Sequence, residues 1–390
     1  MFEYFPDNYA WNLTVSTLFD EVGTTTEPEE ALRALRPVAG GDRSSANEAW
    51  YQSLTRLAER LERLAEADTA EGHPLTAGRK YYRAALYYLR AERFMPHTDP
   101  REVLAYSRGI ACYRKAFELQ NSPVEFVDVP FGKASLPALF VPAATPGPAP
   151  CMIFLQGFDS LKEWYFPMTA MEFRRRGVAM LIVDQPGAGG ALRLHRLPAV
   201  PETEGAVGAC IDWLQGLRAD VVDMNRVGVM GISLGGYYAP RAAAFEKRIA
   251  ACIAWGAIWD FSVVLERSFA GLETSPSIPD MVRHGMWVCG KKTAAEFRDV
   301  ARAMTLEGVA GRITCPLLVM HGENDRQVPL WTATKTVDAA VNARRRDLKI
   351  FTLDEGGAEH CQIDDRRRGA DFAADWAAEI LGGNPRGATA

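Results

Sequence analysis

A serine between two glycines is the part of this chain best suited to chemistry. Residues 231–235 read Gly-Ile-Ser-Leu-Gly, with Ser233 in the middle, and they follow the apolar run 227–230. This is the G-x-S-x-G pattern of a nucleophile elbow, a sharp turn between a strand and a helix that exposes the serine hydroxyl. Glycine suits both flanks because larger side chains would collide where the strand enters and the helix leaves. The pattern predicts Ser233 as a nucleophile, with the Leu234 amide at a helix N-terminus stabilising developing negative charge.

A serine hydroxyl needs a general base, and the base needs a carboxylate that orients it. His360 follows the strand-like run 348–353, and Asp325 follows the strand-like run 317–320. The carboxyl ends of parallel strands meet at one edge of an open sheet, where such folds place their sites. We therefore expect Ser233, His360 and Asp325 to form a triad.

Other residues compete for the acid and base roles. His321 precedes the acid at the end of a strand, which favours a structural hydrogen bond. Asp260 follows another strand-like run and Glu323 shares the acid's loop, so both are alternative acids. Cys361 is next to the base, but nothing near it in sequence supplies the basic surroundings of a reactive thiolate, so we expect a passive neighbour. The other histidines are expected at the surface or in hydrogen-bonded core positions: His73, His97, His195 and His284. For His284, which lies in the expected insertion, a substrate contact stays open.

The second oxyanion donor is expected in the loop after the apolar run 151–155. This loop, residues 156–163, reads Gln-Gly-Phe-Asp-Ser-Leu-Lys-Glu. Gly157 lets the backbone approach closely, and the amide of Phe158 is the expected partner of the Leu234 amide. Aromatic residues near these positions indicate a flat or aromatic substrate, although each of them is more often a core residue: Trp164, Tyr165, Phe166, Tyr237, Trp255 and Trp259.

Two different patterns of elements position these residues. Up to residue 121 apolar residues recur at helical spacing, which predicts an α-helical accessory domain. The third of its helices opens with Asp99-Pro100, an N-cap followed by proline. The three apolar stripes are Trp50, Leu54, Leu57, Leu61 and Leu64; Leu75, Tyr82, Leu86 and Leu89; and Val103, Tyr106, Ile110, Tyr113 and Phe117.

From residue 122 to 384 short strands alternate with helices. This alternation predicts a parallel, doubly wound α/β sheet, opened by a hairpin of residues 124–129 and 136–141. Residues 259–311 break the alternation and carry helix patterns at 279–287 and 293–304. We expect a helical insertion over the sheet there, because the stretch is too long for an ordinary connection.

Composition limits the classes of partner. The net charge of −5 over 390 residues gives no reason to expect nucleic acid or an anionic membrane. The longest apolar stretch, 250–265, contains Asp260 and is shorter than the roughly 20 residues that span a bilayer. The N-terminus has no signal-peptide pattern, and seven scattered cysteines fit a reducing cytoplasm. No metal-binding pair or dinucleotide fingerprint is present, so we expect no cofactor and no metal.

Taken together, these motifs resemble one α/β-hydrolase group. They are the elbow with its Gly-Tyr continuation, the run Ala-Cys-Ile-Ala-Trp-Gly at 251–256, the loop at 156–163 and the helical N-terminal domain. The group contains 2,6-dihydropseudooxynicotine hydrolase, the fungal yellowish-green polyketide-shortening hydrolases and, more distantly, the fermentation–respiration switch esterases. The resemblance implies a mostly parallel eight-stranded sheet, an N-terminal helical cap over the site, and a homodimer. It also carries the triad roles onto Ser233, Asp325 and His360.

The resemblance implies cleavage of a carbon–carbon bond next to a ketone in a mid-sized aromatic or polyketide-like metabolite. The same residues would cleave an ester, so a simple carboxylesterase stays open. So does a non-hydrolytic elimination or cyclisation with His360 as the base. A third class of function, a protein-binding module of N-terminal helices with a residual triad, is the alternative that we favour least.

Overall fold

An eight-stranded sheet forms the centre of the larger part of the chain. The structure, a computed structural model, describes residues 2–270 and 280–387. Strand order is β1-β2-β4-β3-β5-β6-β7-β8. β1 and β2 pair as an antiparallel hairpin, β2 pairs antiparallel with β4, and the pairs from β4 to β8 are parallel. The predicted hairpin and mostly parallel sheet are confirmed. The strands are β1 (Glu125–Phe131), β2 (Ala134–Val141), β3 (Ala149–Leu155), β4 (Ala179–Val183), β5 (Val222–Ile232), β6 (Cys252–Trp255), β7 (Leu317–Gly322) and β8 (Arg346–Phe351).

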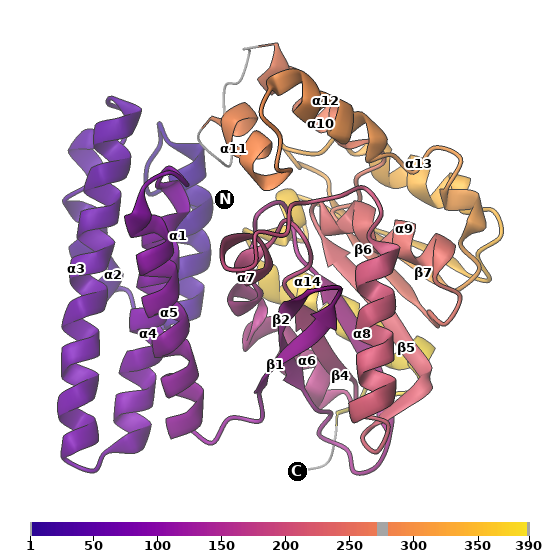
Figure 1. The fold of residues 1–390 in the computed structure, drawn as a ribbon, viewed down its shortest axis with the longest axis horizontal. Helices are drawn as coiled ribbons and strands as arrows, with labels where there is room; N and C mark the ends of the chain where they lie inside the picture. Colours follow the sequence, from indigo (N-terminus) through magenta and orange to yellow (C-terminus); the bar gives the residue numbers. More distant parts are fainter. Residues whose placement is uncertain (1, 271–279, 388–390) are drawn as a thin grey trace. The chain divides into compact units, whose positions relative to one another are not determined.

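Helices cover the sheet on both faces. α8 and α9 contact each other and pack on β5, while α6 and α14 form a second contacting pair. Figure 1 shows α8 in front of the sheet and α14 behind it. Every residue of β3 and β4 is buried, as expected for central parallel strands covered on both faces. The helices of this part outside the segment between β6 and β7 are α6 (Met168–Arg175), α7 (Gly189–Arg193), α8 (Glu204–Leu217), α9 (Gly235–Phe245), α13 (Trp331–Ala339) and α14 (Arg366–Leu381), with the short turns η3 (Lys162–Tyr165) and η5 (His360–Gln362).

The segment between β6 and β7 is helical where it is described. It holds α10 (Phe261–Phe269), α11 (Met281–Val288), α12 (Ala294–Ala303) and η4 (Ala310–Arg312). α11 and α12 correspond to the helix patterns expected at 279–287 and 293–304. α12 begins with a capping box of Thr293 and Glu296. Residues 271–279 of the expected insertion lie outside the described residues.

The N-terminal part is helical, as expected. Its elements are α1 (Tyr9–Val22), α2 (Thr26–Arg33), η1 (Arg36–Val38), α3 (Arg43–Ala70), α4 (Pro74–Ala91), η2 (Glu92–Phe94) and α5 (Pro100–Leu119). The side chain of Asp99 accepts a hydrogen bond from the Arg101 amide and Pro100 is the first residue of α5, which confirms the predicted cap. The described residues form two compact units, one with residues 2–123 and 280–284, the other with residues 124–270 and 285–387.

Three members of the apolar stripes are exposed in the structure. Leu64 is 46% exposed, Leu75 59% and Val103 37%. On α3 the fully buried position after Leu61 is Ala65, which turns Leu64 toward solvent. Leu75 and Val103 lie in the first turns of α4 and α5.

Candidate active site

The serine elbow has the backbone geometry that its glycines predict. Ser233 lies between β5 and α9 with a left-handed φ of 55°. A Cβ at Gly231 would lie 2.1 Å from the Gly235 carbonyl oxygen, and one at Gly235 would lie 2.6 Å from the Leu155 carbonyl oxygen. Only glycine fits at either place, and the strain at the serine is held by packing on both sides. The Ser233 amide donates to the Trp255 carbonyl at 2.8 Å, which ties the elbow to β6.

The structure brings the three residues expected as a triad into one hydrogen-bonded chain. His360 Nε2 lies 2.9 Å from Ser233 Oγ, and His360 Nδ1 lies 2.7 Å from Asp325 Oδ2. Ser233, Asp325 and His360 follow β5, β7 and β8, three strands whose carboxyl ends share one edge. With Nδ1–H donating to the carboxylate, Nε2 has a lone pair for the serine proton. This arrangement can deprotonate a serine hydroxyl.

Burial and charge act against each other at the acid and base. Burial raises the pKa of Asp325, but attraction to His360 and the hydrogen bonds that the carboxylate accepts outweigh it, so the pKa lies below its ordinary value. The other carboxylate oxygen accepts from the Gln327 and Val328 amides, each at 2.8 Å. Burial lowers the pKa of His360, but the Asp325 carboxylate and the neighbouring Cys361 side chain together raise it to well above the ordinary value. The pair therefore favours a charged imidazolium once the proton has been taken.

The loops of the acid and the base are joined by residues that the sequence analysis did not single out. The carboxylate of Glu359, 5% exposed, accepts from Arg326 Nε at 3.1 Å and Nη2 at 3.0 Å. Its Oε1 also accepts from Asn324 Nδ2 at 3.0 Å. A Cβ at Gly322 would lie 2.2 Å from the Ala358 carbonyl oxygen, so the two loops touch through their backbones. The position of Glu359 just before the base was the one signal that could have pointed to it.

The competing residues have other partners. His321 Nε2 lies 3.0 Å from the Val328 carbonyl oxygen and 3.5 Å from Asp325 Oδ2, so it supports the acid instead of replacing the base. Asp260 Oδ1 accepts from both the amide and the hydroxyl of Ser262 at the start of α10. Glu323 Oε2 accepts from the Leu353 amide at 2.9 Å.

Cys361 follows His360 in sequence, and its thiol also lies beside the His360 ring nitrogen that faces Ser233. Its Sγ is 3.4 Å from His360 Nε2 and 3.8 Å from the Trp255 carbonyl oxygen. The backbone is left-handed at both Cys361 and Gln362, with φ of 52° and 53°, and this turn places the thiol beside the base. A Cβ at Gly256 would lie 2.5 Å from the sulfur, so the thiol fills the space that the glycine leaves.

The expected oxyanion donors lie on either side of Ser233. Leu234 is the residue that precedes α9, so its amide belongs to a helix N-terminus. A Cβ at Gly157 would lie 3.2 Å from Ser233 Cβ, which places the next residue, Phe158, beside the elbow. The Phe158 ring stacks at 5.5 Å against Phe261 of α10. Their role as donors stays a prediction.

The aromatic residues expected near the site are mostly core. Trp255 is fully buried and its Nε1 donates to Gln362 at 2.5 Å. Tyr237 is fully buried and its hydroxyl donates to the Pro201 carbonyl at 3.1 Å. Tyr165 packs at 4.6 Å against Phe154 of β3. Phe166 and Trp259 are also buried, and Trp164 is half-buried.

Three of the remaining histidines belong to other parts of the chain. His195 Nε2 is 3.5 Å from Ser135 Oγ, and His284 is half-buried in α11. His97 is half-buried in the connection between η2 and α5.

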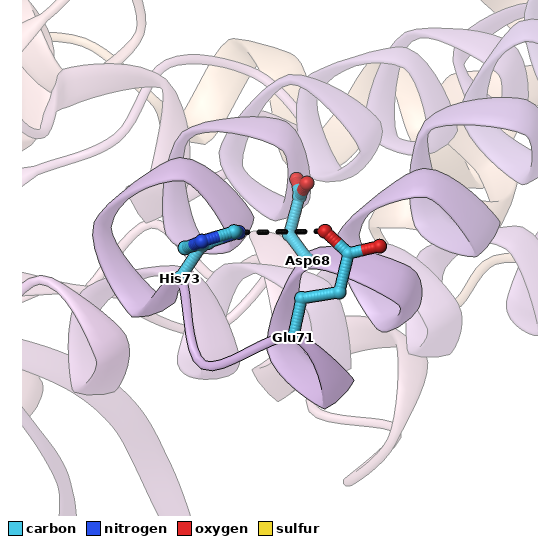
Figure 2. A group of neighbouring side chains, drawn as sticks. All are labelled: Asp68, Glu71 and His73. Carbon is cyan, nitrogen blue, oxygen red and sulfur yellow. Dashed lines mark ion pairs between the residues drawn. The ribbon is translucent and has the colours of Figure 1, made fainter.

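One group of side chains in the described part of the chain is close enough to share a metal ion. Figure 2 shows it at the turn between α3 and α4: Asp68, Glu71 and His73, with His73 Nδ1 3.5 Å from Glu71. Glu71 and His73 are exposed, and Asp68 also pairs with Lys80. Because Lys80 already neutralises the Asp68 carboxylate, surface ion pairs explain why these three side chains lie together.

Among the described residues no helix has the length and apolar character to cross a membrane.

Comparisons with known proteins agree with the fold. Residues 164–384 match the prolyl oligopeptidase family. The chain is 32% identical over 333 residues to 2,6-dihydropseudooxynicotine hydrolase of Paenarthrobacter nicotinovorans, which covers 85% of this chain and 84% of that protein. It is 30% identical over 315 residues to a 20-hydroxy-prefusarin hydrolase of Gibberella moniliformis, 72% of this chain and 75% of that one. The crystal structure of 2,6-dihydroxy-pseudo-oxynicotine hydrolase superposes with a TM-score of 0.74 at 28% identity, covering 94% of this chain and 95% of that one.

These matches confirm the resemblance and the fold that the sequence predicted. The relatives are named hydrolases and act on small molecules, and the chain is an enzyme of the same kind. The chain therefore belongs to the prolyl oligopeptidase family of α/β-hydrolases, in the group of hydrolases that includes 2,6-dihydropseudooxynicotine hydrolase.

Proposed function

We propose that this hydrolase cleaves a carbon–carbon bond next to a ketone in a mid-sized aromatic or polyketide-like metabolite. The observation that carries the proposal is the chain of hydrogen bonds from Ser233 through His360 to Asp325. The relatives named for 2,6-dihydropseudooxynicotine and 20-hydroxy-prefusarin support the substrate class. No organic cofactor or metal enters the proposed reaction.

In the proposed reaction His360 Nε2 takes the proton of Ser233 Oγ, and the oxygen attacks the ketone carbon. The amides of Leu234 and Phe158 donate to the resulting oxyanion. When the oxyanion collapses, the bond from this carbon to its α-carbon breaks, and the electron pair leaves as an enolate stabilised by the second carbonyl group of a β-diketone-like substrate. The imidazolium of His360 protonates that enolate. His360 then removes a proton from water, whose oxygen attacks the acyl carbon. When this second oxyanion collapses, the imidazolium returns the proton to Ser233 Oγ, and the acid is released.

A carboxylesterase is the second candidate, because the same residues release an alkoxide by the same steps. A panel of aryl esters and β-diketones separates the two by kcat/KM. Hydrolysis of either kind places one oxygen from heavy-oxygen water in the acid product. An unlabelled product would instead indicate elimination or cyclisation with His360 as the base.

The test of the nucleophile is Ser233→Ala with Ser262→Ala as the matched control. Ser262 also lies at the start of a helix and its hydroxyl donates to Asp260 at 2.6 Å. Ser233→Ala is expected to lower kcat by roughly 10⁶-fold and to abolish labelling by a serine-directed phosphonate, while Ser262→Ala keeps both. Full turnover by the Ser233→Ala protein would refute the proposal.

The wider setting of the enzyme is part of the same proposal. The chain up to residue 121 acts as a cap for the catalytic domain 122–384, and the protein is a cytoplasmic homodimer. All seven cysteines are buried and unpaired, which supports a reducing compartment. Light scattering after gel filtration tests the dimer, and hydrogen exchange with and without a bound phosphonate tests the cap.

A further inference from the structure

Two segments beside the elbow are held together by an unusual number of polar contacts. The donor loop, residues 156–163, follows β3, and the bracing segment, residues 184–193, follows the neighbouring strand β4 and ends with α7 (Figure 1). The side chain of Gln185, in the bracing segment, forms hydrogen bonds with both backbone polar groups of Gln156 in the donor loop. Its Oε1 accepts from the Gln156 amide at 2.9 Å and its Nε2 donates to the Gln156 carbonyl at 3.1 Å.

Asp184 makes the second connection. Its carboxylate accepts from the Lys162 amide at 3.1 Å, from Lys162 Nζ at 2.8 Å and from the Gly190 amide at 2.9 Å. A Cβ at Gly189 would lie 2.2 Å from this carboxylate, so only glycine lets the segment close over it. The Gly189 amide in turn donates to the Ser160 carbonyl at 2.9 Å.

The third connection is a buried ion pair between Arg193 and Asp159. Arg193 Nη1 lies 2.5 Å from Asp159 Oδ1 and Nη2 lies 3.2 Å from Oδ2, with 2% and 1% of the side chains exposed. The guanidinium lies 5.4 Å from the centre of the Trp287 ring. Asp159 has a left-handed φ of 45°, a conformation that costs energy outside glycine. The two-pronged pair therefore holds a strained residue directly after Phe158.

We infer that Arg193 is a positioning residue, which through Asp159 fixes the donor loop so that the Phe158 amide can face the oxyanion. A buried ion pair contributes little to stability compared with apolar residues of the same size, whereas its fork geometry fixes orientation. Oxyanion donors stabilise a transition state only when they are held in place beforehand. This inference rests on the proposed function, in which Phe158 is one of the donors.

Arg193→Lys is the main test because it keeps the charge and loses the planar fork. The readouts are the rate constant of acylation by an aryl ester, KM, and inhibition by an aryl trifluoromethyl ketone, which forms a tetrahedral adduct with an oxyanion. We expect acylation to slow about 10- to 100-fold, with inhibition weakened in parallel and KM changed less than about threefold.

The matched control is Arg90→Lys, which alters an equally buried pair in the N-terminal helices. Arg90 Nη2 lies 2.7 Å from Glu21, with 3% and 5% of the side chains exposed. This variant is expected to lower the melting temperature and leave acylation unchanged. A merely structural role for Arg193 predicts the same for Arg193→Lys, and that result would overturn the inference.

Asp159→Asn covers the case in which Arg193→Lys does not fold. Asparagine tolerates the left-handed conformation and keeps one oxygen acceptor. We expect slower acylation and weaker trifluoromethyl ketone inhibition, and unchanged values would refute the inference. If Ser233→Ala is inactive while both loop variants acylate normally, the proposed function holds and only the positioning role fails.

Discussion

The ion pairs of the donor loop and two pairs on the N-terminal helices place the same kinds of side chain in opposite surroundings. The Asp159–Arg193 and Lys162–Asp184 pairs are at most 4% exposed. In the pair of Arg60 with Glu30 the side chains are 42% and 61% exposed, and in that of Arg108 with Glu59 they are 37% and 41% exposed.

Water decides what each kind of pair can do. An exposed pair is screened and contributes about 0–1 kcal/mol to stability. A buried pair has lost its hydration, so removing one partner lowers stability by about 3–5 kcal/mol. The loss also displaces the segment that the pair positions. The comparison teaches that buried charge can fix the geometry of the segment it pairs with, whereas the two exposed helical pairs add little to stability.

The largest effect that can test this contrast is expected from Asp325→Asn. The asparagine keeps the shape but no longer stabilises the imidazolium, so kcat should fall roughly 10⁴-fold. His360 accepts the serine proton only when neutral, and the Asp325 carboxylate raises its pKa. The acid limb of kcat/KM should therefore move to lower pH in the variant. A pH–rate profile measures this, and a limb that stays in place or moves to higher pH would contradict it.

The next effect is expected from Glu359→Gln, which weakens the connection between the acid and base loops. The neutral amide still accepts from Asn324 but loses the charge that pairs with Arg326. We expect kcat to fall about tenfold, because His360 follows directly and reacting groups lose rate when displaced. Glu379→Gln is the matched control in an exposed pair with Arg345 and should leave kcat unchanged. Equal kcat in both variants would show that the Glu359 contacts do not help to position His360.

A smaller effect is expected from Cys361→Ala. The thiol is a weak hydrogen-bond donor at 3.4 Å from His360 Nε2, so its loss should change kcat/KM less than about threefold. Steady-state kinetics with the aryl ester would decide. A loss of more than about tenfold would show that an uncharged neighbour matters as much as the buried charges.

The smallest effect is expected from Arg60→Ala. Its pair with Glu30 is exposed, so the free energy of unfolding should fall by at most about 1 kcal/mol, and by less in high salt. Urea denaturation at two salt concentrations measures this. If the free energy of unfolding falls by more than about 2 kcal/mol regardless of salt, exposed and buried pairs do not differ in the way that we infer.

Local features of the sequence predicted the local structure around the candidate site. The Gly-Ile-Ser-Leu-Gly run specifies its own turn, because sterics between residues 231 and 235 leave few other conformations. The strand runs before Asp325 and His360 placed both residues after parallel strands. The apolar stripes predicted the helices but not every buried position: Leu64 follows Leu61 at helical spacing, yet Leu64 is exposed and Ala65 is buried.

The sequence by itself determined a serine elbow, the order along the chain of the residues that we propose as nucleophile, acid and base, and the alternation of strands and helices. Only the tertiary structure decided which side chains hold these parts. Arg193 and Asp159 are 34 positions apart, and they meet because β4 lies beside β3 in the sheet. Arg326 and Glu359 meet through the pairing of β7 with β8. Such pairs leave no local pattern, since their partners are set by the order of strands and by the burial that strengthens them.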